Sequence, residues 1–146
     1  MKISNLLILG ETGVGKSYGT LCLTTEIIKK GYSASVLTAF EMTNLFLKYH
    51  TTIDAEKIEA LSPILDPDLL VIDDLGTEPI LKNVTLEYLY LIIAERMNKQ
   101  KLTVITSNLS LSNILDRYGE RIFSRLNNKE LSAVIKLQGD DLRLKI

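Results

Sequence analysis

The stretch Gly10-Glu11-Thr12-Gly13-Val14-Gly15-Lys16-Ser17 matches G-x-x-x-x-G-K-[ST], the pattern of a phosphate-binding loop. An apolar run at residues 3–9 precedes it and predicts a buried strand, and a helical pattern follows from Lys16 to Lys30. In this order, strand, glycine-rich turn and helix bring successive backbone N–H groups and a helix N-terminus to one point, where they bind a polyphosphate. The stretch therefore predicts both an α/β fold and a nucleotide ligand.

Each residue type in the loop has a physical role. Lys16 is expected to place its charge on the β- and γ-phosphates, and the Ser17 hydroxyl is expected to bind Mg²⁺. The three glycines allow a tight turn and a close approach of the backbone to the anion. We expect the loop from Gly10 to Ser17, with Tyr18 beside it, to contact ATP or ADP. The alternative is an ordinary glycine-rich turn between a strand and a helix.

Composition bounds the remaining possibilities. The 146 residues correspond to one domain, with 46% hydrophobic and 24% charged residues, as in a globular protein. No apolar stretch approaches the roughly 18 residues of a membrane span, and Met1 leads directly into a strand without a signal peptide. The single Cys22 excludes an internal disulfide and is expected in the core, in a cytoplasmic protein. The net charge of −1 gives no global basic field for nucleic acid.

Strands and helices are predicted to alternate along the chain. Further strands are expected at residues 34–39, 69–74, 102–106 and 133–137. Helices are expected at 42–49, around Ile58 and Leu61, at 86–97 with a Glu95–Lys99 ion pair, after an N-cap at Ser110, and at 120–126. This order predicts a three-layer α/β/α fold around a five-stranded parallel sheet, with ligands beyond the carboxyl ends of the strands.

Acidic residues follow the apolar run at residues 69–72. A buried carboxylate at Asp73 needs a partner, and Mg²⁺ shared with Ser17 and the phosphates is a natural one. Asp74 is a candidate to orient or deprotonate the attacking water, and Glu78 competes with it for that role. The alternative is that the two aspartates only begin a turn.

Other polar residues carry weaker signals. Asn108 ends the fourth strand and is either a ligand of the γ-phosphate or attacking water, or a turn former. Arg121 and Arg125 share one helix face, which is either a solvated basic face or the source of an arginine for phosphoryl transfer, and Arg143 has the same alternatives. His50 has no second metal ligand near it in the sequence.

Four segments together resemble the AAA+ domain of the DnaC/DnaI helicase-loader family, which includes the IstB-type transposition helpers. The segments are Gly10–Ser17, Leu69–Glu78, Ile105–Leu109 and Tyr118–Leu126. The resemblance spans Asn5 to Arg143. It implies an ATPase of the additional-strand class that assembles side by side with ATP between subunits. It also implies binding to single-stranded DNA and to a hexameric replicative helicase.

The resemblance also implies roles for single residues. Asn108 matches sensor 1, Arg121 matches an arginine finger acting on the neighbouring subunit's ATP, and Arg143 resembles sensor 2. Asp74 stands where AAA+ domains usually have Glu, so we expect slow hydrolysis. We expect one AAA+ domain over residues 1–146, without a separate C-terminal lid, as in loaders and unlike most AAA+ proteins. Its start at the first strand, without the N-terminal helicase-binding domain of loaders, suggests an isolated AAA+ domain or a minimal phage or mobile-element homologue.

Four functions remain open at this stage. The first is a replicative helicase loader, and the second is a transposition helper with the same site residues. The third is a small-molecule or nucleoside kinase, which would need an acceptor pocket and a lid over the phosphates. The fourth is a nucleotide-gated binding module with negligible hydrolysis. Lysines at 48, 57, 82 and 101 are scattered, so single-strand DNA binding rests on the resemblance alone.

Overall fold

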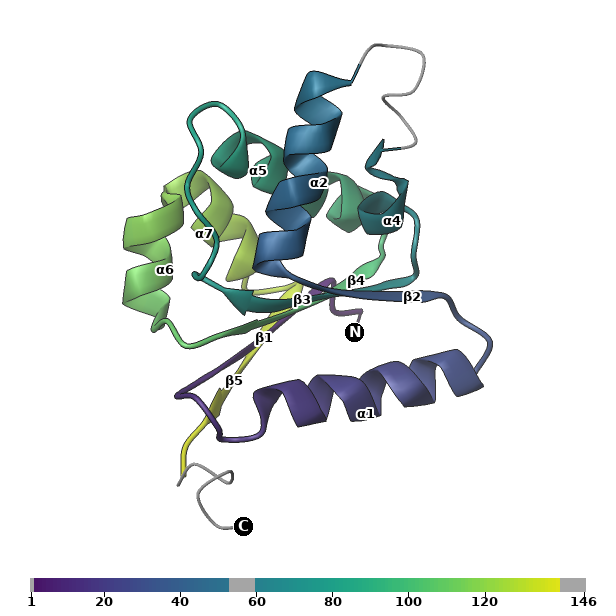
Figure 1. Ribbon diagram of the computed structural model, residues 1–146. Coiled ribbons are helices and arrows are strands. Elements are labelled where there is room, and N and C mark those ends of the chain that lie inside the picture. The colour runs from purple at the N-terminus through teal and green to yellow at the C-terminus, as the bar shows by residue number, and fades with distance from the viewer. Residues whose placement is uncertain (1, 53–59, 140–146) are drawn as a thin grey trace.

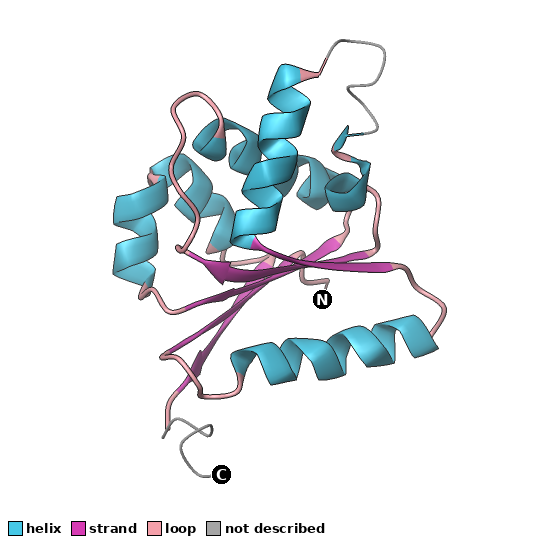
Figure 2. Ribbon diagram, viewed as in Figure 1, coloured by secondary structure: helices cyan, strands magenta, loops and turns pink. Residues whose placement is uncertain are grey.

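The protein is a three-layer α/β/α sandwich. The computed structural model describes residues 2–52 and 60–139 of the chain. Helix α1 (Lys16–Lys29) covers one face of the sheet, and the other described helices cover the opposite face (Figures 1 and 2). The predicted fold class is thereby confirmed.

The sheet is entirely parallel and has five strands. They are β1 (Asn5–Gly10), β2 (Ala34–Thr38), β3 (Leu69–Leu75), β4 (Leu102–Ser107) and β5 (Ser132–Leu137). Their order across the sheet is β2-β3-β4-β1-β5. Strand β4 therefore lies between the strand that leads into the glycine-rich loop and the strand that ends in aspartates. This arrangement brings the carboxyl ends of β1, β4 and β3 together at one edge (Figure 1).

The helices on the second face begin and end close to the predicted positions. They are α2 (Ala39–Thr51), α4 (Ser62–Leu65), α5 (Thr85–Asn98), α6 (Leu111–Tyr118) and α7 (Glu120–Leu126). Ser110 caps α6 as predicted, because its hydroxyl accepts a hydrogen bond from the backbone N–H of Asn113 at 3.1 Å. The Glu95–Lys99 ion pair on α5 is also confirmed, at 3.4 Å.

Apolar packing on the two faces of the sheet is unequal. The larger cluster lies between the sheet and the helices of the second face, and fully buried Phe46 and Ile92 are among its members. The smaller cluster, around Val71 and Val104, is covered by Leu23 of α1 and its neighbours. Helix α1 turns a second row of residues to solvent, and Cys22 is in that row. The expectation that Cys22 belongs to the core is therefore wrong.

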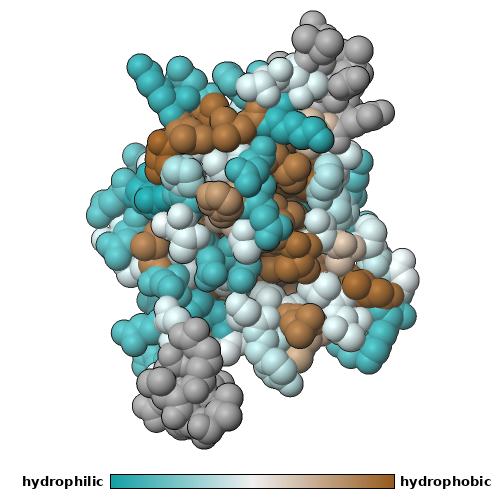
Figure 3. Space-filling view, in the orientation of Figure 1, coloured by the Kyte–Doolittle hydropathy of each residue, from teal (hydrophilic) through white to brown (hydrophobic). Residues whose placement is uncertain are grey.

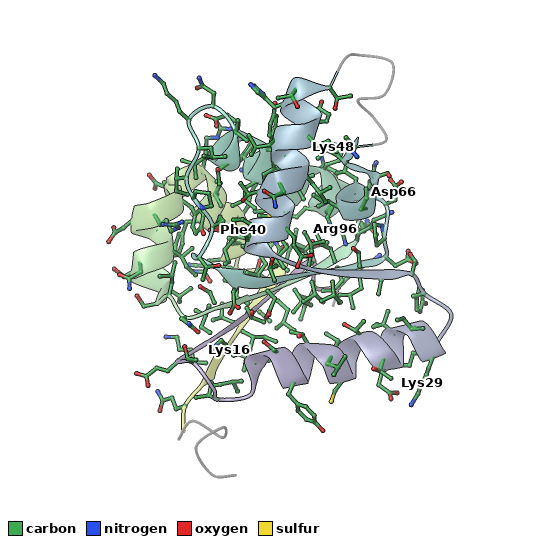
Figure 4. All side chains as sticks on the ribbon, in the orientation of Figure 1. Lys16, Lys29, Phe40, Lys48, Asp66 and Arg96 are labelled. Atoms are coloured by element: carbon green, nitrogen blue, oxygen red, sulfur yellow. The ribbon has the colours of Figure 1, made fainter. Side chains whose placement is uncertain are left out.

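Arg96 of α5 is completely buried in the larger layer (Figure 4). Its guanidinium donates hydrogen bonds to the carbonyl oxygens of Ile64 at 3.0 Å, Pro67 at 2.8 Å and Leu102 at 2.7 Å. Burial lowers the pKa of Arg96 to about 10, which leaves the group charged at neutral pH. Arg96 thus ties α4 and its following turn to the amino-terminal ends of β3 and β4.

Some predictions need correction or lie outside the described residues. His50 belongs to the last turn of α2 rather than to a polar turn, and its Nδ1 lies 2.6 Å from the Tyr88 hydroxyl. The helix predicted around Ile58 falls partly on residues 53–59, and Arg143 falls on residues 140–146; both ranges lie outside the described residues.

The surface carries no single dominant apolar face in the view of Figure 3. Brown apolar patches are separated there by polar side chains. Val36 and Phe40 are among the large apolar residues that are more than half exposed. Isolated exposed apolar residues of this kind are ordinary on globular proteins. Within residues 2–52 and 60–139, no helix has the length and apolar character needed to cross a membrane.

Candidate functional site

The glycine-rich loop joins β1 to α1 at the carboxyl edge of the sheet. Gly13 and Gly15 have φ angles of 85° and 99°, in the left-handed region where a Cβ is disfavoured. Helix α1 begins directly after Gly15, and the first N–H groups of an α-helix have no partner within the helix itself. The loop therefore has the backbone geometry that the sequence pattern predicts for binding an anion.

Lys16 lies folded back over its own loop. Its Nζ donates hydrogen bonds to the carbonyl oxygens of Gly10 at 2.6 Å and Glu11 at 2.8 Å, and only 5% of the residue is exposed. Figure 4 places Lys16 at the start of α1, at the end of the sheet where the strands terminate. The ammonium group is therefore held at the loop by main-chain oxygens, which phosphate oxygens can replace.

Asp73 meets Ser17 as the sequence predicts. The Ser17 hydroxyl lies 3.1 and 3.2 Å from the two carboxylate oxygens of Asp73. Thr106 of β4 donates a further hydrogen bond to Asp73 at 2.6 Å, and the Thr106 hydroxyl in turn accepts one from the N–H of Asp74 at 3.0 Å. The carboxylate is thus oriented by hydroxyl groups from α1 and from the neighbouring strand.

Asp74 has an unusual backbone conformation. Its φ angle is +59°, and the pairing of β3 with β4 shifts register between Ile72 and Leu75. Aspartate tolerates the left-handed region better than most residues, at some cost in conformational energy. The register shift coincides with this conformation, and Asp74 lines the cavity beside the glycine-rich loop.

Asn108 also reaches the loop. Its Nδ2 donates a hydrogen bond to the Thr12 hydroxyl at 3.0 Å, so the end of β4 contacts the glycine-rich loop directly. Of the two readings left open for Asn108, this contact favours a ligand-facing side chain over a turn former. The amide stands at the rim of the same cavity as Asp74.

Two cavities flank the loop and share Asn108. One, of about 470 Å³, is lined by part of the glycine-rich loop together with Asp74 and Asn108; its residues are Thr12, Gly13, Gly15, Lys16, Ser17, Tyr18, Asp74 and Asn108. The other, of about 420 Å³, includes Gly10, Glu11 and Val14 together with residues 136–139. The predicted loop residues therefore divide between two neighbouring hollows.

The donor set fits a magnesium ion that completes its shell with phosphate and water. Mg²⁺ is commonly bound by one or two protein oxygens plus substrate phosphates. The Ser17 hydroxyl and the Asp73 carboxylate supply such oxygens side by side. In the described part of the chain, no group of three or more His, Cys, Asp or Glu residues could hold a metal by itself.

Glu78 and Arg121 do not join this site. The Glu78 side chain is fully buried against Tyr118 and Arg117 of α6, so it does not compete with Asp74 for water in this structure. Arg121 and Arg125 stack on the ring of Tyr90 in α5, with guanidinium carbons 3.9 and 4.5 Å from the ring centre. Neither arginine lines the cavities beside its own loop.

Sequence reasoning missed two contributors. Thr106 orients Asp73, but a threonine inside a buried strand is common and gave no distinguishing signal. Tyr118 binds Glu78, and the two residues lie 40 positions apart. Both belong to the segments that carry the family resemblance, and that was their only available signal.

Comparison with known proteins agrees with this geometry. A family model described as IstB-like ATP binding protein matches residues 1–146. The chain is 27% identical over 144 residues to an insertion sequence IS5376 putative ATP-binding protein of Geobacillus stearothermophilus, covering 97% of this chain and 56% of that protein. It is 26% identical over 155 residues to the replicative helicase loader DnaI of Bacillus subtilis, covering 97% of this chain and 48% of that protein.

A solved structure is also similar. The crystal structure of the DnaC helicase loader superposes with a TM-score of 0.76 at 25% identity, covering 92% of this chain and 78% of that one. The chain spans about half the length of the curated relatives it matches.

Proposed function

Because the chain belongs to the IstB-like ATP-binding protein family, we propose that its AAA+ domain, spanning residues 1–146, binds ATP with Mg²⁺ and hydrolyses it slowly. The observation that carries this proposal is that residues of the glycine-rich loop, Asp74 and Asn108 line one cavity at the carboxyl edge, while Ser17 of that cavity is hydrogen-bonded to Asp73. Phosphate release from ATP without a second substrate would exclude the alternative of a small-molecule kinase.

Binding follows from groups already in place. The N–H groups at the start of α1 receive the phosphates, and Lys16 exchanges its two carbonyl partners for phosphate oxygens. Ser17 and Asp73 would hold Mg²⁺, which would supply positive charge to the phosphates. Tyr18, largely exposed at the cavity rim, lies beside the nucleotide.

Hydrolysis needs a positioned water. Asp74 lines the cavity and is the residue we assign to orient that water, and Asn108 is assigned to bind the γ-phosphate or the same water. The shorter side chain of Asp, in place of the Glu usual in AAA+ domains, holds water less closely. Turnover is therefore expected to be slow.

Arg121 acts in trans in this proposal. It is exposed and lies outside its own nucleotide cavities, so it serves the ATP of a neighbouring subunit in an ATP-bridged assembly. Stacking on Tyr90 keeps Arg121 and Arg125 on one exposed face of the domain. Arg143 is proposed as a further contact to the phosphates.

Two biological roles are compatible with this chemistry. A helicase loader, binding a hexameric replicative helicase and single-stranded DNA, is supported by the similarity to DnaI and by the DnaC structure. A transposition helper is supported by the family model and by the IS5376 relative. Binding of the purified protein to a replicative helicase and to a transposase, each with ATP present, separates the two roles.

The catalytic part is tested by turnover at increasing protein concentration. We expect ATP hydrolysis per subunit to rise as subunits associate, and Arg121→Ala to remove this rise while leaving ATP affinity unchanged. Lys82→Ala, which removes an exposed cation elsewhere, is the matched control. Full activity of concentrated Arg121→Ala protein would show that the arginine finger is assigned incorrectly.

A further inference from the structure

A buried carboxylate lies in the loop between β3 and α5, where the proposed reaction gives it no part. None of the Glu78 side chain is exposed. Its oxygens accept hydrogen bonds from the Gly76 N–H at 2.9 and 3.3 Å and from the Tyr118 hydroxyl, and Arg117 lies 3.5 Å away as an ion-pair partner. A carboxylate buried with this many donors is held in one position, since losing a donor would leave a charge unpaired.

The donors on α6 keep their protons. Burial and the neighbouring Glu78 charge raise the pKa of the Tyr118 hydroxyl, so it remains a donor at any physiological pH. Burial by itself lowers the pKa of Arg117, but Tyr118 and Glu78 more than offset this and raise it overall. Arg117 also donates to the main-chain carbonyl of Glu78. Arg117 and Tyr118 at the end of α6 thus bind both the side chain and the backbone carbonyl of Glu78.

The same loop sets the position of Asp74. The Asp74 carbonyl accepts hydrogen bonds from the Thr77 N–H at 3.3 Å and the Thr77 hydroxyl at 2.8 Å, which closes a tight turn. Gly76, inside this turn, has a φ of +110°, and a Cβ there would lie 2.8 Å from a methyl carbon of Leu109. Because Glu78 binds the Gly76 N–H, it fixes a residue inside this turn.

We propose that Glu78 is a positioning residue for hydrolysis: it fastens the turn that carries Asp74 to Tyr118 and Arg117, and so aims Asp74 at the attacking water. The inference rests on the proposed function, because it takes Asp74 as the water-orienting group. It also gives the Glu78–Tyr118 contact a second consequence. Helix α7, which carries Arg121, begins two residues after Tyr118. In an assembly, the turn that holds Asp74 in one subunit is therefore connected through Tyr118 to the surface by which Arg121 would contact the neighbouring subunit.

Two variants with a matched control test this role. Glu78→Gln keeps the shape but removes the charge, and Tyr118→Phe keeps the carboxylate but removes one donor. Tyr88→Phe is the control, because it removes a hydroxyl that bonds His50 away from the site. Affinity for ATP with Mg²⁺, the rate of bound-ATP hydrolysis in a single turnover, and the folded fraction are measured for each.

We expect both site variants to hydrolyse bound ATP about tenfold to a hundredfold more slowly, because small displacements of a positioned group have effects of this size. Their ATP affinity should stay within about twofold of wild type, and Tyr88→Phe should match wild type in rate. Exchange of the Gly76 amide proton, measured without nucleotide, should accelerate in both site variants and not in the control.

The contrary results are distinct. A wild-type rate per folded molecule in Tyr118→Phe would overturn the positioning role, since a purely structural contact changes stability without changing the rate. An equal loss of ATP affinity and rate would also overturn it. Should Glu78→Gln fail to fold, Tyr118→Phe decides the question alone. If wild-type protein binds ATP but releases no phosphate, the proposed hydrolysis fails first and the positioning role fails with it.

Discussion

Two buried cations, Lys16 and Arg96, are held by main-chain carbonyl oxygens at opposite edges of the sheet (Figure 4). Lys16 is at the carboxyl edge, where its two carbonyl partners belong to a glycine-rich loop that lines open cavities. Arg96 is near the amino edge, where its guanidinium is fully enclosed by α4, α5 and two strands. The bonding is alike, but only Lys16 stands where a ligand can take over its hydrogen bonds.

This difference separates binding from stability. A flexible ammonium group on a four-carbon stem exchanges partners easily, whereas the planar guanidinium of Arg96 matches a fixed set of oxygens. We therefore expect substitutions at Lys16 to weaken nucleotide binding and spare the fold. Substitutions at Arg96 should lower stability and leave the site of the folded protein intact.

The largest effect is expected for Arg96→Met. It leaves at least three buried carbonyl groups without a donor, and the free energy of unfolding should fall by about 3–5 kcal/mol. Urea unfolding followed by circular dichroism measures this change. Lys99→Met, which breaks an exposed ion pair on the same helix, should cost less than about 1 kcal/mol. Equal costs for the two variants would contradict the distinction drawn here.

Lys16→Ala should have the next largest effect, and on binding alone. Loss of its charge-assisted hydrogen bonds should weaken ATP binding roughly a hundredfold, equivalent to about 2.7 kcal/mol. Titration with a fluorescent ATP analogue measures the affinity, and the unfolding experiment checks the fold. A variant that binds ATP as well as wild type but unfolds much more easily would place Lys16 in the same class as Arg96.

Thr106→Val tests whether metal binding at the carboxyl edge depends on the hydrogen bond that orients Asp73. Valine fills the same space but cannot donate to Asp73, so the carboxylate loses one of its two orienting hydroxyl groups. Affinity for ATP with Mg²⁺ should fall about tenfold, whereas affinity in the presence of a chelator should change little. A loss of the same size in both conditions would mean that Thr106 acts on the loop rather than on the metal.

The smallest effect concerns a carboxylate near the amino edge. A hydrogen bond from the Ser33 N–H lowers the pKa of Asp68 from its ordinary value of 3.8. Ionised Asp68 therefore stabilises the fold at any pH above its ordinary pKa of 3.8. This stabilisation is lost as the pH falls through the lowered pKa of the folded protein. Asp68→Asn should be less stable than wild type at pH 7, and the difference should shrink below pH 4. A difference that is constant with pH would exclude this linkage.

The carboxyl edge was more predictable from sequence than the rest of the molecule. Its residues must follow strands directly, so the Gly10–Ser17 loop, Asp73 and Asn108 were placed from local patterns alone. Ser110 was also predicted, because helix capping depends on residues three positions apart. Local constraints of this kind leave a readable pattern in one sequence.

Contacts between distant segments left no such pattern. Arg96 falls within an amphipathic helix and resembles any surface arginine until α4 and β4 enclose it. Glu78 looked like a candidate base because its partners, Arg117 and Tyr118, lie about 40 residues further on. Cys22 was wrongly predicted to lie in the core. Helix α1 packs only one row of its residues on the sheet, and the spacing of apolar residues did not show that Cys22 lies outside that row.

We propose that ATP and Mg²⁺ bind together at the carboxyl edge, between the glycine-rich loop and Asp73. Calorimetric titration of the wild-type protein with ATP, with Mg²⁺ and with excess chelator, tests it most directly. We predict saturable binding of one nucleotide per chain that weakens when Mg²⁺ is removed and falls roughly a hundredfold in Lys16→Ala. No measurable binding of ATP or ADP by folded wild-type protein in Mg²⁺ would contradict it.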